Sequence, residues 1–216
     1  VISMSAYVAE FLGLMAVFSV IIVAPGADFA LVIRQCIVHG RSTALITSVG
    51  IGMSLLFHIS YTILGIGLIV SKSLLLFSAL KWAGAAYLVW LGVQSWREPA
   101  FRMDESSEGA PVQSVSGPKA FAMGFITNAL NPKPVLFFLS LFSALVSPHT
   151  PAVVQFSYGL GMATALIVWF VGVSYFFASR PVRRKFLTYG RAFNRITGAL
   201  FIGLGVRLAL AQAKAN

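Results

Sequence analysis

Two short interruptions of otherwise apolar stretches contain the polar residues of this chain that are best placed to bind a ligand. The first runs from Pro25 to Asp28 and contains one carboxylate. The second runs from Asn128 to Lys133 and contains two amides and one ammonium group. Ionisable groups inside apolar segments are costly in a membrane, and they usually have a function there. Asp28 and Lys133 together could bind the ammonium and the carboxylate of a zwitterion.

Each interruption is expected to begin a new half-helix, whose first turn has unpaired N–H groups and the positive end of the helix dipole. We expect Asp28 to cap the first half-helix, and Asn131 to cap the second with Pro132 at its first position. If the two breaks meet, their N-termini form an anion site like those that hold carboxylates in transporters with discontinuous helices. The expected substrate-binding residues are Pro25, Gly26, Asp28, Asn128, Asn131, Pro132 and Lys133.

A structural interpretation of the same residues also stays open. Lys133 opposes the dipole of its own half-helix, so it needs either a bound carboxylate or Asp28 as a partner. In the second case Asp28 would only cap a helix and pair with Lys133. The two interpretations do not exclude each other.

The composition predicts an integral membrane protein made only of helices. Hydrophobic residues make up 58% of the chain, charged residues make up 10%, and the mean hydropathy is +0.86, whereas soluble domains contain about 25% charged residues. A crossing needs about 20 apolar residues, and we expect six, at 6–38, 44–70, 74–96, 119–146, 152–178 and 196–211. The first of these has no basic residue before it and no evident cleavage site, so we expect it to be retained.

Landmarks in the two halves of the chain recur in the same order. Ser-x-Gly-x-Gly-Met occurs at 48–53 and at 157–162 (157 − 48 = 109), and Pro25 corresponds to Pro132 (132 − 25 = 107). Gly92 and Gly205 are a third pair (205 − 92 = 113). Ordered landmarks predict a duplication, and an odd number of spans in each half makes the second half inverted. We therefore expect two inverted three-helix repeats, 1–97 and 118–216, with broken helices 1 and 4, joined by a flexible cytoplasmic linker at 98–117.

Basic residues indicate the orientation of the spans. Eleven lie in the loops after spans one, three and five, against four on the opposite face, which places the first group in the cytoplasm and both termini outside. The eleven are Arg34, Arg41, Arg97, Arg102, Lys119, Arg180, Arg183, Arg184, Lys185, Arg191 and Arg195. Topology thus explains the net charge of +10 without nucleic-acid binding. We expect the basic segment 180–195 to be a cytoplasmic loop whose charge topology alone explains, although it could also contact anionic lipid headgroups.

Other residues allow more than one interpretation. His58 is a candidate for proton coupling, as is Asp28, but a lone histidine in an apolar helix can equally be hydrogen-bonded to a neighbour. Four glycines are expected to permit close helix packing or gating: Gly50, Gly52, Gly159 and Gly161. Packing through glycine-rich faces could also produce a homodimer. The single cysteine, Cys36, excludes an internal disulfide, and no cofactor is expected.

Three segments resemble the signature segments of the LysE/RhtB amino-acid exporter family, especially its homoserine, homoserine lactone and threonine efflux branch. They are Ala24 to Phe29, Ser48 to Gly52 and Thr127 to Lys133, and the resemblance covers essentially the whole chain. The first motif of that family usually reads Pro-Gly-Pro, and here Ala27 replaces the second proline. The resemblance implies export of small amino acids or their derivatives across the bacterial inner membrane, coupled to the proton gradient.

Two other classes of protein remain as alternatives. A divalent-metal exporter would need a cluster of Asp, Glu, His or Cys at membrane depth, and the spans offer only Asp28 and His58. A membrane-embedded enzyme would need a catalytic pair, and none is evident. We therefore expect a transporter and not an enzyme, with metal export as the alternative function.

Overall fold

The computed structural model describes residues 3–72, 74–99, 114–177 and 179–213. Every regular element in these ranges is an α-helix, as the composition predicts. The helices are α1 (Met4–Val23), α2 (Ala27–His39), α3 (Arg41–Lys72), α4 (Leu74–Arg97), α5 (Gly117–Ala129), α6 (Pro132–Leu145), α7 (Ala152–Phe176), α8 (Arg180–Thr188) and α9 (Gly190–Ala213). Most of the expected linker 98–117 lies outside the described residues.

Four of these helices are long and apolar enough to cross a membrane. The apolar stretches are Met4–Val23, Arg41–Gly67, Ala152–Phe176 and Gly190–Leu210, and α6 contains a shorter one, Leu136–Leu145. This confirms the prediction of a helical membrane protein. The arrangement as two inverted repeats of three spans stays a prediction.

Proline explains why the helices end at both expected breaks. Pro25 and Pro132 lack the N–H that a helix interior needs, and each disfavours the helical conformation of the residue before it. Between α1 and α2 the backbone is extended, with φ −62° and ψ 127° at Ala24 and φ −152° and ψ −162° at Gly26. Between α5 and α6, Leu130 keeps nearly helical angles of φ −87° and ψ −3°. The first break is therefore the more open of the two.

The capping role expected of Asp28 is wrong. Gly26 is the residue that precedes α2, no side chain caps the helix there, and Asp28 lies inside the first turn. Its carboxylate is instead hydrogen-bonded to Asn128 of α5. At the second break α6 begins at Pro132, directly after Asn131, so Pro132 occupies the first helical position as expected.

The basic segment 180–195 is not a loop, which corrects another expectation. It forms α8 and the first turns of α9. Helix α8 has a proline in its first turn, where the missing N–H costs nothing. Phe186 of α8 packs against Phe29 of α2 and Phe177, with ring centroids 5.4 and 4.6 Å apart. This aromatic packing stabilises a helix that the charge pattern alone did not predict.

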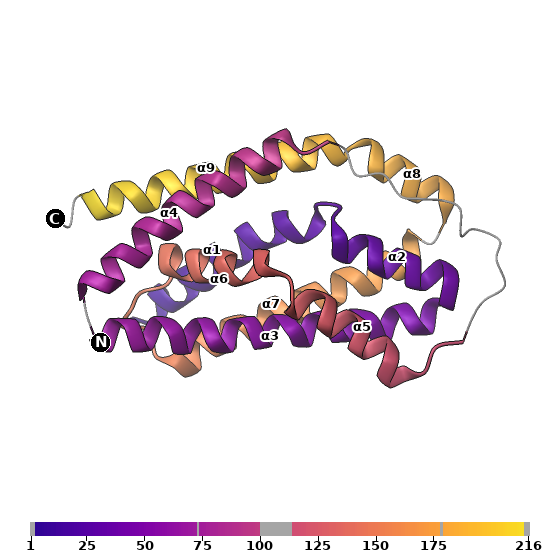
Figure 1. The fold of residues 1–216 in the computed structure, drawn as a ribbon, viewed down its shortest axis with the longest axis horizontal. Coiled ribbons are helices and arrows are strands. Elements are labelled where there is room, and N and C mark those ends of the chain that lie inside the picture. Colours follow the sequence, from indigo (N-terminus) through magenta and orange to yellow (C-terminus); the bar gives the residue numbers. More distant parts are fainter. Residues whose placement is uncertain (1–2, 73, 100–113, 178, 214–216) are drawn as a thin grey trace.

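The helices lie in two groups, with α1, α2 and α6 between them (Figure 1). Helices α4 and α9 lie side by side along one edge, and α3 packs against α5 and α7 along the other. Successive long segments run in alternating directions, so that α1 and α2 run opposite to α5 and α6. The end of α2, the start of α5 and α8 lie toward one end of the molecule, whereas the end of α4 and the start of α9 lie nearer its middle.

Glycine allows the closest helix contacts. A Cβ atom at Gly50 of α3 would overlap the carbonyl oxygen of Phe121 in α5. One at Gly92 of α4 would lie 2.7 Å from the carbonyl oxygen of Gly198 in α9. The other three glycines of the expected set face side chains instead: Gly52 faces Ile167, Gly159 faces Ile59, and Gly161 faces Phe11. Backbone contact between helices therefore occurs at the α3–α5 and α4–α9 crossings.

Candidate functional site

A cavity of about 320 Å³ lies where the two helix breaks come together. This volume is at the lower end of the range of small-molecule sites, which is roughly 300–1,000 Å³. Both breaks line it, together with residues of α1, α4, α7 and α9. Its polar lining residues are Asp28, Ser95, Glu98, Asn131, Asn194 and Thr197, and most of the others are apolar. The cavity is thus a small, largely apolar space with a few polar groups.

Asp28 has one carboxylate oxygen that is hydrogen-bonded and one that is not. Its Oδ2 accepts a hydrogen bond of 2.8 Å from Nδ2 of Asn128. Its Oδ1 is buried and has no hydrogen-bond partner among the residues that the structure describes. A buried acceptor without a partner costs about 1–3 kcal/mol, and more when it is charged. Asp28 can therefore accept a hydrogen bond from a cationic group of a ligand in the cavity.

Asn128 joins three helices through its side chain and its backbone. Its Nδ2 donates to Asp28 of α2, and its Oδ1 accepts a hydrogen bond of 3.0 Å from Oγ of Ser54 in α3. Its carbonyl oxygen is 3.1 Å from Nε2 of His58, also in α3. Asn128 is buried, so these bonds are shielded from water. The asparagine connects the first break to the end of α5, where the second break begins.

His58 occupies a position that the second break itself creates. A carbonyl oxygen can only accept, so Nε2 of His58 carries the proton that it donates to Asn128, and Nδ1 accepts from the hydroxyl of Tyr61. In a continuous helix the N–H of residue 132 would bond to this carbonyl, but Pro132 has none. His58 supplies a donor in its place. The same carbonyl oxygen also accepts a hydrogen bond of 3.0 Å from the N–H of Asn131. His58 therefore has a structural role, and its role in proton coupling stays a prediction.

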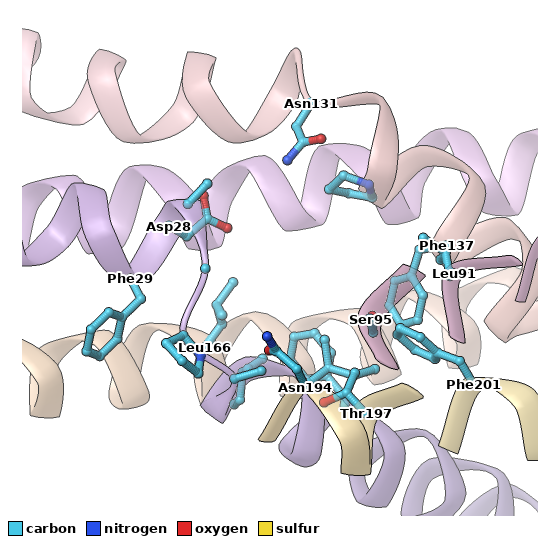
Figure 2. A pocket seen from close by; sticks show the side chains of 18 of the residues that line it. Asp28, Phe29, Leu91, Ser95, Asn131, Phe137, Leu166, Asn194, Thr197 and Phe201 are labelled. Atoms are coloured by element: carbon cyan, nitrogen blue, oxygen red, sulfur yellow. The ribbon is translucent and has the colours of Figure 1, made fainter. Parts of the chain in front are cut away.

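The second break contributes Asn131 directly to the cavity. Figure 2 shows its side chain extending into the open space from the same side as Asp28. The side chains of Pro132 and Lys133 lie outside the described part of the structure, so their expected roles stay predictions. Over the described ranges no three His, Cys, Asp or Glu residues come close enough together to hold a metal ion.

The opposite wall of the cavity contains polar residues that the sequence analysis missed. Ser95 of α4 and Asn194 and Thr197 of α9 all line the cavity and are buried. Nδ2 of Asn194 is 3.4 and 3.2 Å from the carbonyl oxygens of Glu98 and Pro99, where it can donate to the end of α4. The spacing of 194, 197 and 201 places these residues on one face of a helix, and it could have indicated this wall.

A second polar cluster lies at the other end of the molecule, away from α8. The carboxylate of Glu10 in α1 accepts hydrogen bonds from three groups. They are the N–H of Ser147 at 2.9 Å, the hydroxyl of Thr150 at 3.0 Å to both oxygens, and the hydroxyl of Tyr158 at 3.1 Å. These bonds join α1 to the α6–α7 connection and to α7.

Apolar helices long enough to cross a membrane, with two breaks around a partly polar cavity, define an integral membrane protein. The chain belongs to the LysE type translocator family, whose model matches residues 19–212. This confirms the resemblance seen in the three signature segments.

Several relatives are similar over most of their length. The chain is 33% identical over 190 residues to the homoserine/homoserine lactone efflux protein of Salmonella typhimurium, covering 87% of this chain and 90% of that protein. It is 27% identical over 202 residues to the threonine efflux protein of Escherichia coli K12, covering 94% and 98%. An uncharacterized membrane protein of Bacillus subtilis, YrhP, is 28% identical over 199 residues, covering 89% and 94%. No solved structure matches the chain.

Proposed function

We propose that this protein is a secondary active exporter of threonine, homoserine or similarly small polar amino acids, driven by the proton gradient. The observation that carries the proposal is the cavity at the two helix breaks, where Oδ1 of Asp28 is buried without a partner among the described residues. The relatives named as threonine and homoserine efflux proteins support the substrate class.

In this proposal the two breaks bind the two charged groups of the amino acid. Asp28 accepts hydrogen bonds from the ammonium group. The N-termini of α2 and α6 border the cavity, and their unpaired N–H groups and dipoles favour the carboxylate. Asn131 and Lys133 stand at the start of α6, where they would add a donor and a cation. Pro25, Gly26 and Pro132 keep the backbone non-helical, and Asn128 holds Asp28 in place.

The cavity is placed for loading from the cytoplasm. Glu98 lines it and is exposed at the end of α4, so the cavity reaches the surface near α8 and the start of α9. That end contains most of the basic residues, and the positive-inside rule assigns it to the cytoplasm. In this orientation both termini lie outside the cytoplasm. The protein itself is proposed to span the bacterial inner membrane. A homodimer stays a prediction, and its interface would have to avoid Gly50, Gly52, Gly159 and Gly161, which contact other helices of the same chain.

Two further features fit a transporter cycle. The opposite directions of α1–α2 and α5–α6 are what inverted repeats require, and such repeats underlie alternating access in other transporters. Asp28 is the one acid at the breaks, so it is the most economical proton carrier, since substrate and proton would compete for the same carboxylate.

The test is export of labelled threonine and homoserine by purified protein in proteoliposomes, with and without an imposed proton gradient. We expect gradient-dependent export in the wild type. In Asp28→Asn and Lys133→Ala we expect a fall of ten- to a hundredfold, because each variant removes a charge that pairs with the substrate. Lys119→Ala is the matched control, since Lys119 is exposed at the start of α5, and it should transport like the wild type.

The outcomes separate the proposal from its alternatives. Protein that is folded but moves no amino acid, and instead moves a divalent cation, would replace this function with metal export. Export that persists in both Asp28→Asn and Lys133→Ala would show that the substrate does not bind at the two breaks. Export that is unaffected by the proton gradient would leave the substrate class in place but exclude proton coupling.

A further inference from the structure

Three polar side chains on α4 and α9 form a second polar surface in the cavity, which we call the α4–α9 polar face. Its members are Ser95, Asn194 and Thr197, with exposed fractions of 5%, 6% and 5%. Figure 2 shows them on the side of the cavity opposite Asp28 and Asn131. Buried polar groups need hydrogen-bond partners. Asn194 has them in the carbonyl oxygens of Glu98 and Pro99, whereas the hydroxyl of Thr197 has none among the described residues.

Thr197 departs from the usual behaviour of buried hydroxyls in this protein. Thr47, Ser48 and Ser174 each donate to the carbonyl four residues earlier in their own helix, at 2.8 to 2.9 Å. The hydroxyl oxygen of Thr197 is also buried but has no partner within the described ranges. A buried hydroxyl without a partner is unfavourable, because it loses its hydrogen bonds to water and gains none in the protein. A ligand group that bonds to Thr197 would remove this cost.

The rest of the wall makes such a bond selective. Phe137 of α6 and Phe201 of α9 line the same part of the cavity and offer no polar side-chain atoms. A ligand hydroxyl in this apolar surrounding can replace its bonds to water with bonds to the α4–α9 polar face. A site built to bond a hydroxyl discriminates strongly against an analogue that lacks it.

We propose that Thr197, with Ser95 and Asn194, binds the side-chain hydroxyl of the exported amino acid. This inference rests on the proposed function, in which the two breaks bind the ammonium and carboxylate groups. The protein would then prefer small amino acids with a hydroxyl on the β- or γ-carbon over aliphatic amino acids of the same shape. The substrate would span the cavity, with its charged end at α2 and α6 and its hydroxyl at α4 and α9.

The experiment compares substrate pairs that differ only in the hydroxyl, using wild-type and variant protein in proteoliposomes. Threonine is paired with valine, and homoserine with norvaline, in which a methyl group replaces the hydroxyl. We expect the wild type to prefer the hydroxyl compound about tenfold, the worth of one good hydrogen bond. Thr197→Val should reduce this preference several-fold to tenfold through slower threonine export, whereas Thr197→Ser should retain it.

Ser143→Ala is the matched control. The hydroxyl of Ser143 is also buried without a partner in the part of the chain that the structure describes, but it lies in α6 beside a separate pocket of about 10 Å³. Loss of this hydroxyl should leave the preference unchanged. The ratio of the two rates is the informative quantity, since a general loss of stability lowers both rates together.

A folded Thr197→Val protein that keeps the wild-type preference overturns the inference and leaves the exporter in place. Wild-type protein that exports no amino acid overturns the proposed function itself. If Thr197→Val does not fold, thermal stabilisation of the wild type decides the matter. Threonine should then raise the melting temperature more than valine at equal concentration, and equal stabilisation would refute the inference.

Discussion

The two helix breaks at the cavity differ in what holds them. At the first break the flanking backbone bonds stay within the adjoining helices, from Ala24 N–H to the Ile21 carbonyl and from Ala30 N–H to the Gly26 carbonyl. At the second break the carbonyl of Asn128 accepts bonds both from its own segment and from His58 of α3. The backbone of the second break is thus held by a side chain of another helix, whereas the backbone bonds at the first break are all local.

This difference has a consequence for movement. A segment with few bonds to its surroundings opens at a lower free energy than one held by a buried network. Asp28 stands on the less restrained break, and its bond to Asn128 is the contact that connects it to the more restrained one. We therefore expect the first break to change conformation during transport, with the second break as the fixed reference.

The largest expected effect comes from cutting the connection between the breaks. Asn128→Leu has a similar volume but leaves Oδ2 of Asp28 and the hydroxyl of Ser54 without their partner. We expect the free energy of unfolding to fall by about 3 kcal/mol, since two buried polar groups lose their bonds, and we expect export to be lost. Unfolding in detergent, followed by fluorescence, measures the first effect.

Ser54→Ala is the control for this substitution, because it removes only one of the two side-chain bonds of Asn128. It should cost about 1 kcal/mol. If Asn128→Leu costs no more than Ser54→Ala, the bond to Asp28 does not stabilise the protein and the breaks are independent.

A smaller effect is expected from loosening the second break alone. His58→Phe removes the donor to the Asn128 carbonyl, and should reduce the free energy of unfolding by about 1–2 kcal/mol. His58→Gln retains a side-chain N–H, and should recover at least half of that loss. Unfolding and gradient-driven export are measured on both variants.

The same pair of variants tests the role of His58 in proton coupling. Glutamine does not titrate near neutral pH, so it can restore a structural bond but cannot carry a proton. Gradient-driven export by His58→Gln would limit His58 to its structural role. A stable His58→Gln protein that still exports without responding to the gradient would instead identify His58 as a proton carrier.

The smallest effect is expected from making the first break resemble the second. Ala27→Pro would place proline at the first position of α2, as Pro132 is at the first position of α6. Gly26 is already extended, which suits a residue before proline. We therefore expect the free energy of unfolding to rise by no more than about 1 kcal/mol, with near-normal export.

Ala30→Pro is the contrasting variant, because it removes the bond to the Gly26 carbonyl. It should lower the free energy of unfolding by about 3 kcal/mol. If Ala27→Pro is destabilising, the first break requires backbone conformations that proline at position 27 does not allow.

The helical class, the membrane location and both breaks could be predicted from the sequence, because proline and apolar runs act locally. Pro25 and Pro132 lack an N–H wherever they stand, so the ends of α1 and α5 do not depend on the rest of the fold. The family could also be recognised, since its signature segments surround these same prolines. Helix α8 could not be predicted, because it is stabilised by contact of Phe186 with Phe29, which is far away in the chain.

The contacts of the site were beyond prediction for a related reason. The bond between Asp28 and Asn128 joins residues 100 positions apart and depends on how α2 and α5 are rotated about their axes. A first-turn aspartate normally suggests a cap, and only its partner Asn128 in α5 explains why Asp28 does not act as one. The α4–α9 polar face was missed because serine, asparagine and threonine in a helix indicate no charge and no break. Their role follows from the cavity that they line.

The carboxylate of Glu10 bears on how fast such a protein could work. Its hydrogen bonds to Ser147, Thr150 and Tyr158 close the end of the molecule that is remote from the basic helices. Release of a substrate at that end would require α1 to part from α7 and the α6–α7 connection, so these bonds must break once in every cycle. Bonds to a charged group contribute about 1.5–3 kcal/mol each before water replaces them. Glu10 would thus influence the turnover number through the lifetime of the closed outer end, while leaving the affinity of the cavity unchanged.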